Sequence, residues 1–319
     1  MRLALILFSV LAAAGQTADI GEPPGARVDV GGRRLHVHCT GAGAPAVILE
    51  AGASAFAIDW SLVQPEIART NRVCSYDRAG HGWSDPRKDA ATPERVVADL
   101  HAALQAAGEK PPYVLVGASM GGLYVRLYQA RFPGEVAGLV LVDPAHEDRL
   151  FTSFQGKAMA IAELTADQLR ATIRPGPMRI PRRQPQTGVP FDKLPRELYE
   201  RRVALEARLI ASIPESLSSD VVLESAEGER ATLAELRAAR LAQEHPLGDR
   251  PVVVLSRGVD SSPEMRDVHA TAARSSRNSR HTVVAGAGHE LHLFEPAAVV
   301  QAIRDVVDSV RSGAMLPRR

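Results

Sequence analysis

The sequence lacks several features that mark specialised classes of protein. Cysteine occurs only twice and aromatic residues make up 4% of the 319 residues, which excludes a disulfide-rich scaffold and indicates a mainly aliphatic core. Neither sign of charge is in excess: 38 basic and 37 acidic residues give a net charge of +1, and the basic residues are scattered. Nothing therefore indicates nucleic-acid binding. No segment reaches the ~18 consecutive apolar residues of a membrane-spanning helix. The length suffices for one large domain with an insertion, or for two domains.

The first 18 residues have the composition of a signal peptide. Arg2 supplies a positive charge, Leu3 to Leu11 is an apolar run, and small residues suited to cleavage follow at 12–14 and 16–18. We expect this segment to direct a secreted or periplasmic protein; a buried first strand or helix is the alternative. Because no cysteine directly follows the apolar run, no lipid anchor is expected. No later segment is apolar over the ~18 residues that a stable membrane anchor needs.

The two cysteines and a pair of histidines allow two further kinds of site. An oxidising compartment permits a disulfide between Cys39 and Cys74, although spacing alone does not distinguish it from two buried thiols. His36 and His38 share one face of a predicted strand. No third ligand lies near them, so we interpret them as solvated strand residues and predict no metal site.

The segment from Pro112 to Gly122 carries the most informative motif of the chain. Tyr113 to Val116 is an apolar run typical of a strand, and Ser119 follows in the pattern G-x-S-x-G, directly before a helix-like pattern. Strand, tight turn and helix are the setting of a nucleophile elbow, in which the serine hydroxyl projects above the sheet. The N–H of Met120 would then point toward an oxyanion. The alternative is a glycine-rich turn without chemistry.

Strand-like and helix-like patterns alternate along residues 46–143 and again along 251–311. This alternation predicts an α/β fold with a mostly parallel, doubly wound sheet and helices on both faces. A hairpin of strands at 27–30 and 33–39 is expected ahead of it.

The alternation stops between residues 145 and 246. Helix-like patterns at 154–172, 194–212 and 229–243 are separated there by proline-rich segments. We therefore expect a core formed by residues 19–144 and 247–313, an inserted helical cap or lid at 145–246, and a disordered tail at 314–319.

Five candidate residues follow predicted strands, where α/β sheets carry their functional loops: Ala53, Ser119, Asp143, Asp260 and His289. A serine hydroxyl is a poor nucleophile until a base removes its proton, and the base needs a carboxylate to fix its tautomer. His289 is the expected base, and the N–H of Ala53 is the expected second oxyanion donor. His81 lies in a turn-rich segment and is a weaker candidate.

Two aspartates remain open as the acid. Asp260 lies four residues beyond Ser256, where a loop after that strand should present it, and Asp143 closes the preceding strand. We prefer Asp260 and keep Asp143 as the alternative.

The chain resembles the α/β-hydrolase superfamily from the hairpin at 27 to the helix ending near 311. The motifs that carry the resemblance are VGASMGG at 116–122, YDRAGHGWSDP at 76–86, LVLVDP at 139–144 and GAGHELHLFEP at 286–296. The resemblance implies an eight-stranded, mostly parallel sheet, Ser119 as nucleophile and His289 as base. It also implies that the two cysteines fall on neighbouring strands, which makes their disulfide plausible.

The resemblance also implies that Met120 and Ala53 provide the oxyanion hole. Two departures from the family pattern stand out. The usual His-Gly after the third strand is Ala51-Gly52 here, and the usual Gly-x-x-Asp is Arg-Gly-Val-Asp, ending at Asp260.

Together these features predict a serine hydrolase that cleaves a small carboxylic ester, or a thioester or amide, through an acyl-enzyme. No cofactor or metal is implied. A serine at the elbow argues against the haloalkane dehalogenases and epoxide hydrolases that share the resemblance. Alternatives are a cofactor-free perhydrolase or haloperoxidase, and an aminopeptidase of the proline-iminopeptidase type with Glu147 and Asp148 binding the amine. A non-catalytic binding protein is a third.

Overall fold

A computed structural model describes residues 20–154, 157–173, 176, 178–179, 183–213 and 216–318. The expected signal peptide at 1–18 lies outside the described residues.

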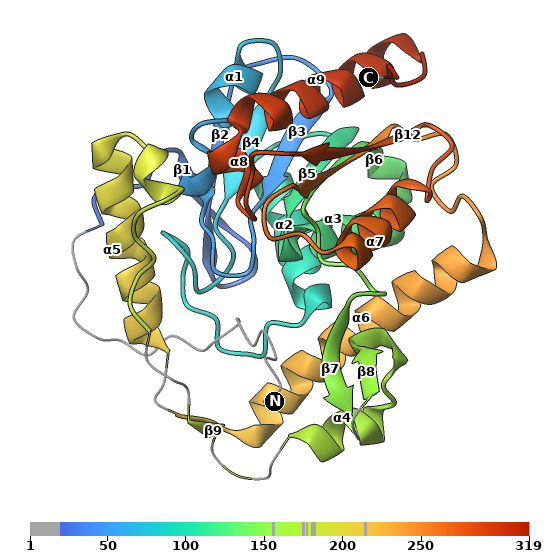
Figure 1. Ribbon diagram of the computed structural model, residues 1–319. Helices are drawn as coiled ribbons and strands as arrows, with labels where there is room; N and C mark the ends of the chain where they lie inside the picture. Colours follow the sequence, from blue (N-terminus) through green and yellow to red (C-terminus); the bar gives the residue numbers. More distant parts are fainter. Residues whose placement is uncertain are drawn as a thin grey trace.

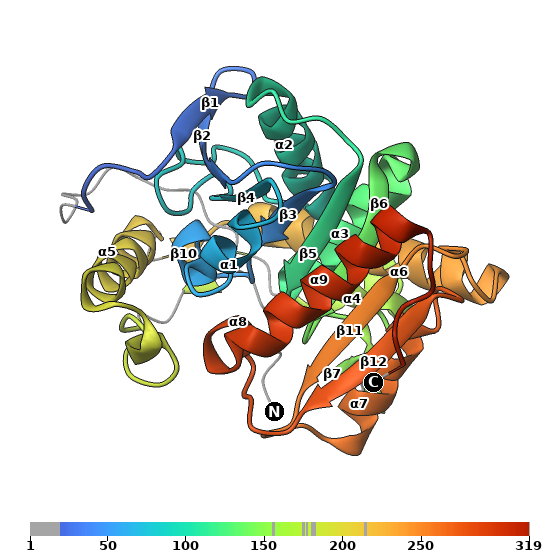
Figure 2. The ribbon, with the colours of Figure 1, turned by 90° about the horizontal axis from the view of Figure 1, so that it is seen from above.

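An eight-stranded sheet forms the centre of the molecule (Figure 2), as the sequence predicts. The strand order is β1-β2-β4-β3-β5-β6-β11-β12, and only β2 runs opposite to the others. The central strands β3 and β5 are buried along their whole length because both faces of the sheet are covered. Their bounds are β1 Ala26–Asp29, β2 Arg34–Thr40, β3 Ala46–Glu50, β4 Val73–Tyr76, β5 Tyr113–Ala118, β6 Val136–Val142, β11 Val252–Arg257 and β12 Ser279–Val284.

Helices cover the sheet on two faces. On one face α2 (Pro93–Ala106), α3 (Met120–Arg131) and the end of α7 (Pro263–Ala273) pack in a single apolar cluster. On the other face α1 (Gln64–Ala68), α8 (Leu291–Phe294) and α9 (Pro296–Ser312) pack against the alternate side chains of the same strands. Short 3-10 helices lie at Ala57–Trp60 (η1) and Pro133–Glu135 (η2). The sheet and the helices on its two faces thus form three layers.

The region between β6 and β11 is only partly as predicted. Instead of one helix over 154–172, β7 (Leu150–Phe154) pairs antiparallel with β8 (Lys157–Ala160), and α4 (Ala166–Thr172) is the α-helix among the described residues of that range. The helices near 194–212 and 229–243 are present as α5 (Arg196–Ser212) and a longer α6 (Ser219–Ala242). In Figure 1, α6 passes beneath the core, and it packs against α2 and α3. Smaller elements are η3 Ile161–Glu163, η4 Phe191–Lys193, β9 Met178–Arg179 and β10 Ser216–Leu217.

The C-terminal residues 314–318 differ from the expected disorder. They run without helix or strand along the end of α9, where Leu316 is buried and its N–H donates to Asn278 Oδ1 at 2.7 Å. Arg280 Nη1 donates to Pro317 O at 2.9 Å. The tail is therefore held by backbone hydrogen bonds that the composition of 314–319 does not reveal.

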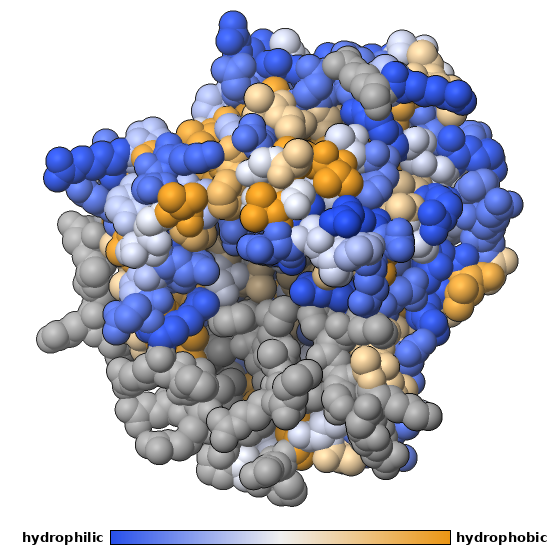
Figure 3. All heavy atoms as spheres, in the orientation of Figure 1, coloured by the Kyte–Doolittle hydropathy of each residue, from blue (hydrophilic) through white to orange (hydrophobic). Residues whose placement is uncertain are grey.

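Among the described residues, no helix combines the length and apolarity needed to cross a membrane. Figure 3 shows the described part of one face as mostly hydrophilic, with hydrophobic side chains scattered among the polar ones.

Candidate active site

Ser119 lies in a strained turn between β5 and α3. Its backbone has φ 52° and ψ −119°, a conformation rarely adopted by a residue with a side chain. Its N–H donates to Val142 O at 2.9 Å, which ties the turn to β6. The two flanking glycines have no space for a side chain, because a Cβ on Gly117 would lie 2.4 Å from Gly121 O and one on Gly121 2.4 Å from Glu50 O. The motif is therefore required by the close contact of strand and helix.

A chain of hydrogen bonds joins three side chains from three loops. His289 Nε2 lies 2.9 Å from Ser119 Oγ, and His289 Nδ1 lies 2.6 Å from Asp143 Oδ2. Because a carboxylate only accepts, Nδ1 carries the proton and neutral Nε2 is free to accept from the serine. The structure thus brings together Ser119, His289 and one of the two candidate acids.

Asp143 is held as a carboxylate by its surroundings. Burial alone acts to raise its pKa, but the hydrogen bond and charge of His289 and the N–H of Arg257 outweigh it and lower the pKa below its usual value. The Arg257 N–H donates to Oδ1 at 3.1 Å, opposite the oxygen that meets His289. Asp143 is therefore ionised at neutral pH and has both oxygens engaged.

The preference for Asp260 is corrected by this geometry. Asp260 is exposed to solvent. The loop that carries it is held one residue earlier, where the N–H of Val259 donates to Ala287 O at 3.0 Å. Asp143, in contrast, follows β6 beside the elbow, and its N–H donates to Leu255 O at 2.7 Å. The acid that meets His289 is consequently the one at the end of the strand next to Ser119.

The loop after β3 lies against the elbow, as expected for a second donor. An added Cβ on Gly52 would lie 3.5 Å from Ser119 Cβ, so this glycine faces the serine directly. Met120 is the first residue of α3, and the first N–H groups of a helix have no acceptor within the helix. The N–H groups of Met120, at the start of α3, and of Ala53, in the loop after β3, thus lie on the two segments that border Ser119.

One group of residues around this loop was missed from the sequence. Arg78, two residues after β4, is buried and contacts the loop after β3, and Glu50 pairs with it at 2.6 Å. His81 is also buried, and burial together with the Arg78 charge lowers its pKa to about 4. The signal in the sequence was an arginine two residues after a strand of buried residues, in the motif YDRAGHGWSDP.

His36 also differs from expectation. It is fully buried rather than solvated, and its Nδ1 lies 2.7 Å from Asp77 Oδ2. It therefore supports the turn after β4.

A cavity of about 210 Å³ opens above Ser119 and His289. Its walls combine small loop residues with polar groups from the region between β6 and β11. The buried Arg202 donates to Asp59 Oδ1 at 3.1 Å, and its guanidinium lies 3.6 Å from the centroid of the Phe191 ring. Burial raises the pKa of Asp59 to about 6. Other residues lining the cavity are Gly52, Ala53, Ser54, Ala55, Ala118, Arg183, Gln186, Glu290 and His292.

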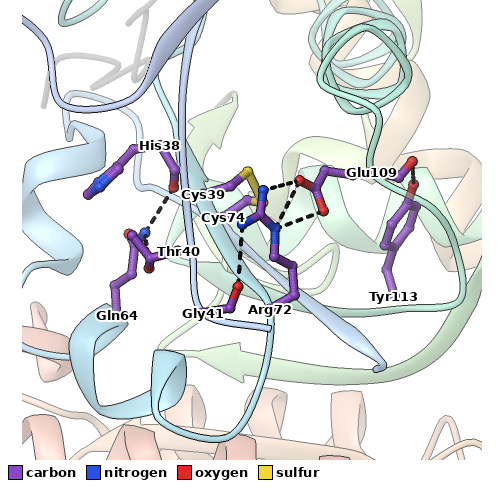
Figure 4. The surroundings of a disulfide bond; sticks show 9 residues. All are labelled: His38, Cys39, Thr40, Gly41, Gln64, Arg72, Cys74, Glu109 and Tyr113. Carbon is purple, nitrogen blue, oxygen red and sulfur yellow. Dashed lines mark hydrogen bonds and ion pairs between the residues drawn. A yellow bond between two sulfur atoms is a disulfide. The ribbon is translucent and has the colours of Figure 1, made fainter. Parts of the chain in front are cut away.

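The described residues include one cluster with three potential metal-ligating groups, Cys39, Cys74 and Glu109 (Figure 4). The two cysteines lie opposite each other on β2 and β4 and form a disulfide, and Glu109 pairs with Arg72 at 2.6 Å. Thiols bound to each other are not thiolate ligands, so this cluster is a cross-link between strands.

Comparisons with known proteins agree with this architecture. A model of the alpha/beta hydrolase family matches residues 35–302. The uncharacterized protein YqjL of Bacillus subtilis is 24% identical over 274 residues, 84% of this chain and 86% of its own. A 2-hydroxymuconate semialdehyde hydrolase of Pseudomonas sp. is 34% identical over 124 residues, 38% of this chain and 44% of its own.

Among solved structures, an esterase from Thermogutta terrifontis superposes with a TM-score of 0.61 at 22% identity, covering 89% of this chain and 98% of that one. Several curated relatives are matched over less than half of their own length. The likeness to the esterase concerns the fold.

Proposed function

We propose that this chain, which belongs to the alpha/beta hydrolase family, is a serine hydrolase that cleaves a small carboxylic ester through an acyl-enzyme. The observation that carries the proposal is the hydrogen-bonded chain from Ser119 Oγ through His289 to Asp143. That arrangement supplies a nucleophile, a base in the required tautomer and a fixed anion behind it.

The proposed reaction begins with attack of Ser119 Oγ on the ester carbonyl carbon, while His289 Nε2 takes the hydroxyl proton. The carbonyl oxygen becomes an oxyanion between the N–H groups of Ala53 and Met120. Collapse of this intermediate breaks the carbon–oxygen bond to the alcohol, which leaves with the proton from His289. Water then attacks the acyl-enzyme with His289 again as base, and the acid is released.

The substrate is proposed to be small. A cavity of about 210 Å³ is below the ~300–1,000 Å³ of sites that take drug-sized ligands. The names of two similar proteins, an esterase and a hydrolase, support hydrolysis as the reaction class.

The aminopeptidase alternative loses its support. Glu147 is buried and pairs with Arg126 at 2.6 Å and with Arg240 at 3.1 Å, and Asp148 pairs with Arg237 at 2.9 Å. Acids engaged in this way do not offer a carboxylate to an α-amino group.

Export from the cytoplasm is part of the proposal. It is supported by the apolar run from Leu3 to Leu11 and by the disulfide between Cys39 and Cys74, a bond favoured by oxidising compartments. N-terminal sequencing of the protein expressed with its full sequence tests this: a mature end near residue 19 supports export, and an intact Met1 contradicts it.

The function is tested by turnover of a graded series of p-nitrophenyl esters by wild type and Ser119→Ala. We expect the shortest acyl chains to be hydrolysed fastest and Ser119→Ala to lose essentially all turnover. Equal rates in the two proteins would refute the serine mechanism. Peroxide-dependent activity exceeding ester hydrolysis would favour the perhydrolase alternative.

A further inference from the structure

Arg78 binds three consecutive carbonyl groups of the loop that follows β3. Its Nη1 donates to Ala51 O at 2.8 Å, and its Nη2 donates to Gly52 O and, at 2.9 Å, to Ala53 O. Arg78 is 7% exposed, so these bonds form away from competing water.

The orientation of one peptide follows directly from these bonds. The carbonyl of Gly52 and the N–H of Ala53 belong to the same planar trans peptide, in which the two groups point in opposite directions. Because Arg78 holds the Gly52 carbonyl, the Ala53 N–H must point away from Arg78. A Cβ on Gly52 would point toward Ser119, at 3.5 Å from its Cβ, whereas the Gly52 carbonyl accepts from Arg78. The loop therefore lies between the guanidinium and the serine.

We infer that Arg78 is a positioning residue that fixes the Gly52–Ala53 peptide with its N–H toward the oxyanion. The inference deepens the proposed function and rests on it. Ala51 stands where the family pattern has a histidine, and its methyl group offers no hydrogen bond to hold this loop. The guanidinium from the neighbouring strand supplies the hydrogen bonds instead.

Arg78 is itself held in place by a carboxylate and by an aromatic ring. Glu50 Oε1 accepts from its Nη1 at 2.6 Å, and Tyr76 donates its hydroxyl to the other oxygen of Glu50. The Tyr124 ring of α3 lies under the guanidinium, 5.6 Å from its carbon to the ring centroid. His81 Nε2 lies 3.0 Å from Ala53 O and adds a second restraint on the loop.

A lysine cannot replace this group. The guanidinium presents several N–H donors in a fixed plane, whereas an ammonium is a compact point charge on a flexible stem. Arg78→Lys therefore keeps the charge next to Glu50 but loses simultaneous contact with the three carbonyls.

The test compares Arg78→Lys with the matched control Arg87→Lys, which alters another buried arginine that pairs with Asp99 away from the site. Loss of one aligned oxyanion donor costs ~10²–10³ in kcat. We expect Arg78→Lys to lower kcat for the best p-nitrophenyl ester by about 10² with KM nearly unchanged. Affinity for an alkyl boronic acid, which forms a tetrahedral anion on serine, should fall in parallel, and Arg87→Lys should match wild type.

A fluorophosphonate probe distinguishes the possible failures. Arg78→Lys should still become labelled at Ser119, since serine and histidine are intact, but more slowly than wild type, because the phosphoryl oxygen of the probe also occupies the oxyanion hole. Normal kcat and normal boronic acid affinity in folded Arg78→Lys would overturn the inference. So would the absence of any labelling of folded Arg78→Lys after prolonged incubation, because Ser119 and His289 themselves would then be disturbed. If wild type neither hydrolyses esters nor labels, the proposed function fails, and the inference with it.

Should Arg78→Lys not fold, Glu50→Gln is measured in the same way. It leaves Arg78 in place and replaces its anchoring carboxylate with an amide. A lower kcat with KM unchanged supports the inference, and wild-type kcat overturns it.

Discussion

Replacing Asp143 by asparagine tests the arrangement around His289, and the structure fixes what the new side chain would do. The N–H of Arg257 donates to Oδ1, so the amide oxygen of asparagine must take that position. Its NH2 group then faces His289 Nδ1 from the position of Oδ2, now 2.6 Å away. Because the amide donates, Nδ1 must accept, and the imidazole proton moves to Nε2. A protonated Nε2 cannot take the proton of Ser119.

The expected loss is about 10⁴ in kcat, since the wrong tautomer costs about that much in serine hydrolases of this type; this corresponds to ~5 kcal/mol of barrier. The assay is kcat and KM for a short-chain p-nitrophenyl ester, with KM expected to change little. Asp260→Asn is the matched control and should retain wild-type turnover. If Asp143→Asn keeps more than about a tenth of wild-type kcat while Asp260→Asn is inactive, the reasoning is refuted.

Three further predictions concern stability. Replacing Cys39 and Cys74 together by serine should lower the free energy of unfolding by up to ~4 kcal/mol, because the bond closes a loop with a sequence separation of 35; an unchanged urea midpoint would contradict this. Glu229 lies on α6, and burial raises its pKa from 4.5 to about 7, so the stability that its protonated form contributes is complete below pH 4.5 and lost as the pH rises through 7. Glu229→Gln should remove this pH dependence, which amounts to at most ~3 kcal/mol in the free energy of unfolding between pH 4.5 and 8. Parallel profiles of unfolding free energy against pH for wild type and variant would refute the prediction. Gly121→Ala should prevent soluble expression, because its Cβ would lie 2.4 Å from Glu50 O; a fully active variant would show that the elbow is less tight.

The elbow could be predicted because its geometry is local. Glycines two residues before and after Ser119 are needed for strand and helix to approach, and both lie in one short segment. The sheet could be predicted for a similar reason, since apolar runs alternating with helical patterns determine a doubly wound architecture.

The acid could not be chosen in the same way. Asp143 and Asp260 both follow buried strands. Which of them meets His289 depends on the path of the loop between β12 and His289, and the sequence pattern does not give that path. The role of Arg78 was hidden for a related reason, because its contacts require β3 and β4 to be neighbours. The strand β8 of the β7–β8 hairpin fell within the helix predicted over 154–172, because short apolar runs fit either period.

The central claim is that Ser119 is a nucleophile activated by His289. Its most direct test is mass spectrometry of the protein after reaction with a fluorophosphonate, with the modified peptide sequenced. The account predicts one adduct per chain, located on Ser119, and a much slower reaction in His289→Ala. An unmodified Ser119 in folded wild type, or equal labelling rates in the two proteins, would contradict it.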